Sequence, residues 1–237
     1  MTFARRLVAE GLGSAMLLAV VVGSGIMAER LAAGNVAIAL LANAIATGAG
    51  LLALILMFGT LSGAHFNPVV TLSEAWQGNL RRADVVPYIA AQIAGAFAGV
   101  AAAHLMFDLP AIQASTHVRT GWPQWWSEFV ATFGLIAVII GCARSRPGMT
   151  PLAVAAYITA AYWFTASTSF ANPAVTLARS ATSTFAGIRA SDAPAFILAQ
   201  LAGAAAATPL FCWLYPAPHR EATVAGTVAR SDFTDKK

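Results

Sequence analysis

Long apolar stretches alternate with short polar segments along this chain. Six of the stretches are long enough, or nearly so, to cross a bilayer, which takes roughly 17–25 helical residues. They lie at about residues 7–28, 35–58, 85–107, 124–143, 150–166 and 193–215, and the fifth is the shortest. The pattern predicts an all-α membrane protein with six transmembrane helices.

Two of the segments between these stretches contain the same helix-start signal. Asn is a preferred N-cap, because its side-chain oxygen accepts from an unpaired backbone N–H, and Pro is favoured at the first helical position. The first copy reads Asn67-Pro68-Val69-Val70-Thr71-Leu72, and the second reads Asn172-Pro173-Ala174-Val175-Thr176-Leu177. A helix that begins at membrane depth is tolerated only where it is buried in protein or lines a water-filled cavity. The repeat therefore predicts two re-entrant half-helices that border a pore.

The chain repeats itself at more than these two boxes. Residues 91–95 in the third stretch match residues 199–203 in the sixth, and Glu10 in the first stretch has a counterpart in Glu128 in the fourth. A re-entrant loop leaves backbone N–H groups unpaired at membrane depth, which is costly. We expect the two glutamates to accept hydrogen bonds from these loops, and the alternative is a role in proton relay.

The two halves form one domain. Repeat one covers about residues 5–107 and repeat two about residues 122–215, within a single membrane channel domain of residues 1–216. Each half has three spans, an odd number, so the second half must run inverted relative to the first. Residues 217–237 are polar, have no hydrophobic pattern, and are expected to form a cytoplasmic tail.

The composition agrees with a membrane protein and suggests its orientation. Hydrophobic residues make up 58% of the chain and charged residues 10%, where soluble domains have about 25% charged residues. Six spans place both termini on the same side of the membrane. Ten of the 14 Lys and Arg residues lie on that side and four on the other, so the positive-inside rule predicts cytoplasmic termini.

Several classes of function lack support in the sequence. No nucleophile–base pair and no metal-ligand spacing stands out, so we expect neither an enzyme nor a cofactor or metal. No basic run has interleaved aromatic residues, so no nucleic-acid partner is expected. A coupled secondary transporter would share the inverted repeat but usually has ion-coordinating or proton-carrying groups at the midplane. It stays as the remote alternative to a channel, beside a closed structural membrane protein.

The residues around the first box resemble a known family signature. The segment Ser62-Gly63-Ala64-His65-Phe66-Asn67-Pro68-Val69-Val70-Thr71 is similar to the first signature of the aquaporin, or major intrinsic protein, superfamily. The second box, the six spans and both glutamates also fit, and the resemblance covers about residues 5–215. It implies an aquaporin-like right-handed bundle in the lipid bilayer, acting as a passive channel and usually a homotetramer. Asn67 and Asn172 would cap the half-helices and donate hydrogen bonds to passing solutes.

The chain departs from the family pattern at two positions. Val69 stands where the first box usually has Ala, and Val175 stands where the second box is normally followed by the Arg of the selectivity filter. Family spacing from the two asparagines puts the other filter positions on Thr47, Ala160 and Ser169. All four filter residues are small and uncharged, so the resemblance implies a wide and mildly polar filter.

The small filter bears on the substrate. Bacterial aquaglyceroporins associated with arsenic resistance are similar, because they too replace the filter Arg with a small apolar residue. The resemblance implies a channel in the bacterial inner (plasma) membrane for glycerol-type solutes, trivalent arsenic hydroxides, methylated arsenicals and water. The alternative is a channel mainly for water.

Three further features have more than one interpretation. Arg179 follows Val175 by one helical turn. Its guanidinium either reaches the outer vestibule and partly replaces the filter charge, or it snorkels to the interface or pairs with the loop. His65 either lines the cytoplasmic vestibule, as its family counterpart does, or is a satisfied loop histidine. The aromatic residues 162–164 are interpreted as an interfacial anchor rather than as a solute contact.

Overall fold

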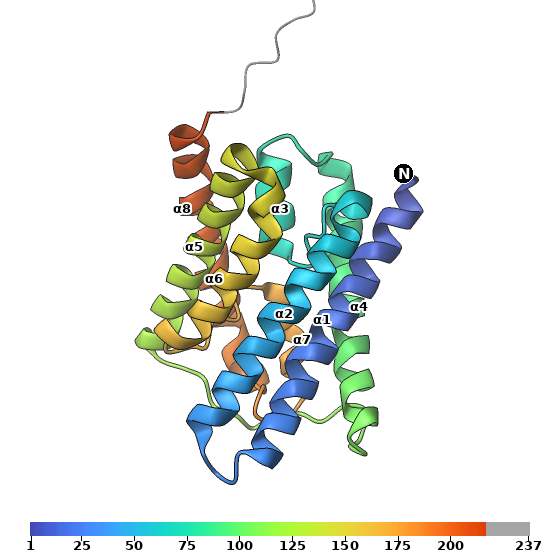
Figure 1. Cartoon of the computed structure of the whole chain (residues 1–237), viewed down its shortest axis with the longest axis vertical. Helices are drawn as coiled ribbons and strands as arrows, with labels where there is room; N and C mark the ends of the chain where they lie inside the picture. Colours follow the sequence, from blue (N-terminus) through green and yellow to red (C-terminus); the bar gives the residue numbers. More distant parts are fainter. Residues whose placement is uncertain (217–237) are drawn as a thin grey trace, which may run out of the picture.

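The computed structural model describes residues 1–216, and that part of the chain is helical without a strand (Figure 1). The α-helices are α1 (Phe3–Leu31), α2 (Val36–Ser62), α3 (Pro68–Trp76), α4 (Arg82–Met106), α5 (Trp122–Ser145), α6 (Thr150–Phe164), α7 (Pro173–Arg179) and α8 (Ala193–Leu214). Short 3-10 turns precede α6 (η1, Pro147–Met149) and α8 (η2, Ala190–Asp192). The predicted all-α class is confirmed, and the predicted tail of residues 217–237 lies outside the described residues.

Within residues 1–216, five helices are long and apolar enough to cross a membrane, namely α1, α2, α4, α5 and α8 together with its preceding turn. The helix α6 occupies the place of the fifth predicted span. Its 15 residues reach only about 22 Å at 1.5 Å per residue, less than a hydrocarbon core of about 30 Å. The shortest apolar stretch of the sequence therefore corresponds to α6, the shortest of the six long helices in the described part of the chain.

Helix ends extend beyond the apolar stretches where the sequence provides caps. Asn35 accepts from the backbone N–H groups of Ala37 and Ile38 and so starts α2. The same helix continues through polar residues to Ser62 and stops where Gly63 adopts a left-handed φ of 93°. That stop directs the chain back into the bundle toward the first box.

The two halves pack as related units. In the first half α1 contacts α2 and α4, and in the second half α5 contacts α6 and α8. A Cβ added at Gly95 of α4 would lie 2.1 Å from the carbonyl oxygen of Gly11 in α1, so these two backbones touch because residue 95 has no side chain. Each half-helix also contacts the last helix of the other half, α3 against α8 and α7 against α4.

The half-helices point in opposite directions from the middle of the bundle. In Figure 1, α3 lies toward the end that has the N-terminus, and α7 lies toward the other end. We call these ends the N-terminal face and the opposite face. The starts of α3 and α7 therefore meet near the middle of the molecule.

Candidate pore and its constriction

The loop before α3 is held by a fully buried carboxylate. Glu10 accepts from the backbone N–H of His65 at 3.0 Å and of Phe66 at 2.8 Å. The Ser62 hydroxyl donates to it at 2.6 Å, and the side-chain amide of Gln92 donates at 2.7 Å. These bonds satisfy N–H groups that no regular structure pairs, at a depth where water would otherwise be needed.

The loop before α7 repeats this arrangement. Glu128, also fully buried, accepts from the backbone N–H groups of Phe170 and Ala171, both at 2.9 Å. The amide of Gln200 donates to Glu128 at 2.6 Å and so takes the position that Gln92 has in the first half. The sequence match at residues 91–95 and 199–203 thus has a structural reason, because it places a glutamine beside each glutamate.

The two asparagines join the boxes to each other. Asn67 caps α3 by accepting from the N–H of Val69 at 3.0 Å, and Asn172 caps α7 in the same way. The amide of Asn67 donates to the carbonyl of Ala171, and the amide of Asn172 donates to the carbonyl of Phe66, each at 2.8 Å. An amide NH₂ has two donors, so one N–H of each asparagine remains for another partner.

The loops before the boxes have matching strained backbones. The φ angles are 51° at Ala64 and 48° at Phe66 in the first loop, and 51° at Ser169 and 47° at Ala171 in the second. Positive φ is uncommon for residues other than glycine and costs of order 1–3 kcal/mol. The bonds to the buried glutamates hold two of these four residues, so each carboxylate stabilises a conformation that the chain would otherwise avoid.

A cavity of about 280 Å³ runs beside both boxes. Most of its wall is apolar and comes from α1, α2, α5 and α6. These wall residues are Leu17, Val21, Leu51, Ile55, Leu135, Ile139, Ala143, Val154 and Ile158. Its polar groups come mainly from the loops and the half-helices, and both asparagines line it. An apolar tube with one polar side can dehydrate a small solute on one flank and replace its hydrogen bonds on the other.

Three of the four predicted filter residues line this cavity, and one does not. Thr47, Ser169 and Val175 are in its wall. Ala160 is exposed on α6 and is not in the cavity wall. Tyr162 lines the cavity, and its hydroxyl lies 3.2 Å from the hydroxyl of Thr47. The cavity wall beside Thr47 therefore contains an aromatic ring that the sequence interpretation had assigned to the membrane interface.

The spacing of residues along α6 explains why Tyr162 lines the cavity and Ala160 does not. Val154, Ile158 and Tyr162 follow one another at intervals of four along α6 and all line the cavity. Tyr162 is 3% exposed, so it is not an interfacial anchor. Trp163 and Phe164 are 48% and 55% exposed on the outside of the helix, where an anchor would lie.

Val69 lies away from the cavity wall. Its side chain is fully buried in a cluster with Ile136 of α5 and Ala204 of α8. The methyl groups that distinguish Val from Ala at this position therefore fill the contact between the half-helix and the bundle. They take no space from the cavity.

His65 and Arg179 line the cavity on opposite sides of the boxes. The His65 ring has Nδ1 3.1 Å from the hydroxyl of Thr71. Arg179 is 2% exposed, its Nε–H donates to the carbonyl of Ala186, and its guanidinium carbon lies 3.4 Å from the centre of the Phe170 ring. Arg179 is therefore folded against the vestibule wall and is not extended toward the outer surface.

A second guanidinium, which is half-buried, supports the same region. Arg119, from the segment between α4 and α5, donates to the carbonyls of Gly187 at 2.8 Å, Ser167 at 3.3 Å and Phe185 at 3.4 Å. Burial lowers the pKa of Arg119 from its ordinary value. No sequence pattern predicts this role, because backbone carbonyls are available along any chain. Its three bonds fix the loops that flank α7.

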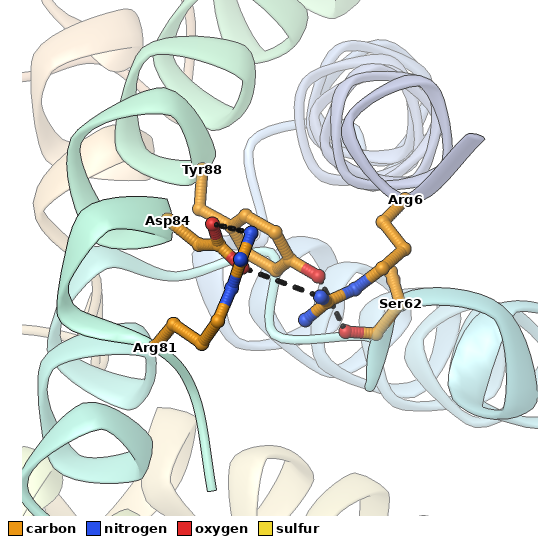
Figure 2. Close-up of polar contacts among 5 residues, drawn as sticks. All are labelled: Arg6, Ser62, Arg81, Asp84 and Tyr88. Carbon is orange, nitrogen blue, oxygen red and sulfur yellow. Dashed lines mark hydrogen bonds and ion pairs between the residues drawn. The ribbon is translucent and has the colours of Figure 1, made fainter. Parts of the chain in front are cut away.

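On the N-terminal face a polar cluster joins α1, α4 and the end of α2 (Figure 2). Asp84 accepts from Arg81 at 2.7 Å and from Arg6 at 3.4 Å. Tyr88 donates to the carbonyl of Ser62 at 3.1 Å, and the guanidinium of Arg6 lies over its ring at 5.1 Å. Because the Ser62 hydroxyl donates to the buried glutamate of α1, this cluster also steadies the loop before α3.

Comparisons with known proteins agree with this geometry. The family description "Major intrinsic protein" matches residues 1–169. The chain is 59% identical over 210 residues to aquaglyceroporin AqpS of Rhizobium meliloti, covering 89% of this chain and 90% of the relative. It is 31% identical over 169 residues to aquaporin Z of Photorhabdus laumondii, covering 63% of this chain and 71% of that protein.

A solved structure shows the same fold. The X-ray structure of the aquaglyceroporin from Plasmodium falciparum matches with a TM-score of 0.66 at 20% identity, over 90% of this chain and 96% of that one. The family match over residues 1–169 and the close similarity to a relative along nearly its whole length identify this chain as a member of the major intrinsic protein family.

Proposed function

We propose that this protein is a passive membrane channel for glycerol-type solutes, trivalent arsenic hydroxides, methylated arsenicals and water. Members of its family are channels, and a relative at 59% identity is named an aquaglyceroporin, which supports small neutral solutes such as glycerol and water. One observation supports the larger solutes in particular. The position after the second box is Val175, which lines the cavity where the family normally has an Arg.

The polar groups of the constriction suit hydroxyl solutes. The hydroxyls of Thr47, Tyr162 and Ser169 can each donate or accept, and the Ser169 hydroxyl is buried without a partner in the described protein. The rest of the cavity wall is mostly apolar. A neutral molecule with several hydroxyl groups can exchange its water for these side chains on one flank and keep contact with the apolar wall on the other.

Solute flux into proteoliposomes tests the function. Glycerol and trivalent arsenic hydroxide should equilibrate much faster than across protein-free liposomes, and collapsing ion gradients should not change the rates. Water flux alone would favour the alternative of a water channel. Accumulation of solute against its gradient would contradict a channel and favour a coupled transporter.

The assembly and orientation are part of the proposal. The chain is a multi-pass membrane protein of a family with bacterial members. We place it as a homotetramer in the bacterial inner membrane, with the N-terminal face in the cytoplasm. Ten Lys and Arg residues on the side of the termini against four on the other support this orientation.

Tyr162 and Ala160 give matched tests of the constriction. Tyr162→Ala removes a ring from the cavity wall and is expected to raise the flux of solutes larger than glycerol relative to glycerol itself. Ala160→Phe adds a ring of similar size on the outer surface of α6 and should leave the flux unchanged. The measurement is uptake of a series of polyols of increasing size. If Ala160→Phe blocks glycerol flux, residue 160 does belong to the selectivity filter, as the family spacing predicts.

A further inference from the structure

Among the described residues, the cavity is lined by one carboxylate and one guanidinium, Glu74 and Arg179. Glu74 follows Asn67 by seven residues, and Arg179 follows Asn172 by seven residues. The two charges therefore occupy equivalent positions on the two half-helices. Because α3 and α7 point to opposite ends of the bundle, Glu74 lies in the vestibule of the N-terminal face and Arg179 in the vestibule of the opposite face (Figure 1).

The other charges near the cavity are of both signs, because Glu10 and Glu128 are fully buried behind the loops that line it. The N-terminus of a half-helix contributes at most about half a positive elementary charge, and two such ends meet between the boxes. Arg179 adds a full positive charge, and Arg119 lies on the same side of the bundle. Without Glu74, no carboxylate would line the cavity, and Arg179 would attract a small anion into it.

The carboxylate of Glu74 has no direct ion-pair partner among the described residues, and Arg144 reaches it only through Gln77, whose amide oxygen accepts from Arg144 at 2.8 Å. Glu74 accepts from two neutral amides, Asn79 at 2.9 Å and Gln77 at 3.3 Å. In the described part of the chain the ion pairs involve other carboxylates, those of Asp84 and Asp192. Glu74 is half-buried, so its negative charge acts on the vestibule rather than on a salt-bridge partner.

We propose that Glu74 is the anion barrier of this channel. Its negative charge on the N-terminal side repels small anions before they reach Arg179, so the pore passes neutral hydroxyl solutes and rejects their conjugate anions. Arg179 and the half-helix ends reject cations on the other side. Each vestibule thus excludes one sign of charge, a task that the family usually assigns to a narrow filter. The inference rests on the proposed channel function.

Ion conductance in planar bilayers tests this assignment with KCl and KNO₃ as probes. The wild type should conduct no more than a protein-free bilayer. Glu74→Gln should conduct chloride and nitrate at least about tenfold above that level, with a reversal potential that moves toward the anion's equilibrium potential. Glu74→Asn removes the same charge and should show the same increase in anion conductance as Glu74→Gln. Glu74→Asp, which keeps the charge, should stay at the wild-type level.

Two further variants separate charge in the pore from charge elsewhere. Glu29→Gln removes an exposed carboxylate of α1 that is not in the cavity wall and should leave conductance at the wild-type level. Glu74→Gln combined with Arg179→Met should conduct less anion than Glu74→Gln alone. An equal conductance in these two would show that Arg179 does not attract anions, and the two-vestibule arrangement would be wrong.

Glycerol efflux from vesicles containing each variant reports whether the pore is open. If Glu74→Gln passes glycerol and conducts no more anion than the wild type, the proposal is overturned. If Glu74→Asp conducts as Glu74→Gln does, packing rather than charge is responsible and the proposal is also overturned. Failure of the wild type to pass glycerol would instead contradict the channel function.

Discussion

Replacing Glu128 with Ala is expected to cost the protein most of its stability and all of its solute flux. The substitution leaves three N–H bonds without an acceptor in the interior: two from the backbone of the second loop and one from the Gln200 amide, whose other N–H donates to Thr176. Each orphaned buried donor costs about 1–3 kcal/mol, so a loss of about 3–5 kcal/mol is a conservative expectation. The strained backbone at Ser169 and Ala171 would then relax and close the cavity.

Thermal unfolding in detergent and glycerol efflux measure this effect. Glu128→Gln is expected to be intermediate, because one amide oxygen can still accept from the loop while the new NH₂ faces N–H donors. Glu29→Ala removes an exposed glutamate of α1 and should leave both readouts at wild-type values. A Glu128→Ala protein with normal unfolding temperature and normal flux would show that the carboxylate does not support the loop.

The boxes and their supports were accessible from the sequence because their chemistry is local and repeated. An Asn-Pro pair specifies a helix start through one side-chain acceptor and one missing donor, whatever surrounds it. Two buried acids in equivalent spans have few possible uses, and unpaired loop N–H groups are one of them. The structure adds the partner that makes each site complete, a glutamine at equivalent places in α4 and α8.

The residues that line the constriction were harder to predict from the sequence, because the rotation of α6 about its axis decides which side chains face the cavity. Counting back from Asn172 gives position 160 only if the loop before the box has the family's conformation. The cavity-facing series Val154, Ile158 and Tyr162 was present in the sequence as a spacing of four and would have indicated the aromatic residue. Glu74 was likewise visible as the counterpart of Arg179, once the two boxes are aligned.

Arg119 shows the limit of sequence reasoning here. Its segment has no periodic pattern, and its guanidinium binds backbone carbonyls of residues that are distant in the chain. Only the folded loops bring those carbonyls together. The same holds for the reciprocal bonds between the two asparagines and the opposite loops, which require both halves in place.

Val175→Arg is expected to convert the wide channel into one that passes water and little else. Val175 of α7 lines the same cavity as Thr47 and Tyr162, whose hydroxyl groups lie 3.2 Å apart. A guanidinium is several atoms longer than a Val side chain and would fill the passage between these groups. Glycerol and arsenic hydroxide flux should fall by about tenfold or more, equivalent to a barrier higher by at least about 1.4 kcal/mol, while water flux persists.

The control for size is Val175→Leu, which adds bulk without charge or donors and should reduce glycerol flux less than Arg does. Stopped-flow measurements on the same vesicles give water and solute rates together. Unchanged glycerol flux in Val175→Arg would mean that the new side chain folds away from the passage, as Arg179 does against Phe170. In that case the constriction would be set by Tyr162 and its partner Thr47, and the absence of the usual Arg would not explain which solutes pass.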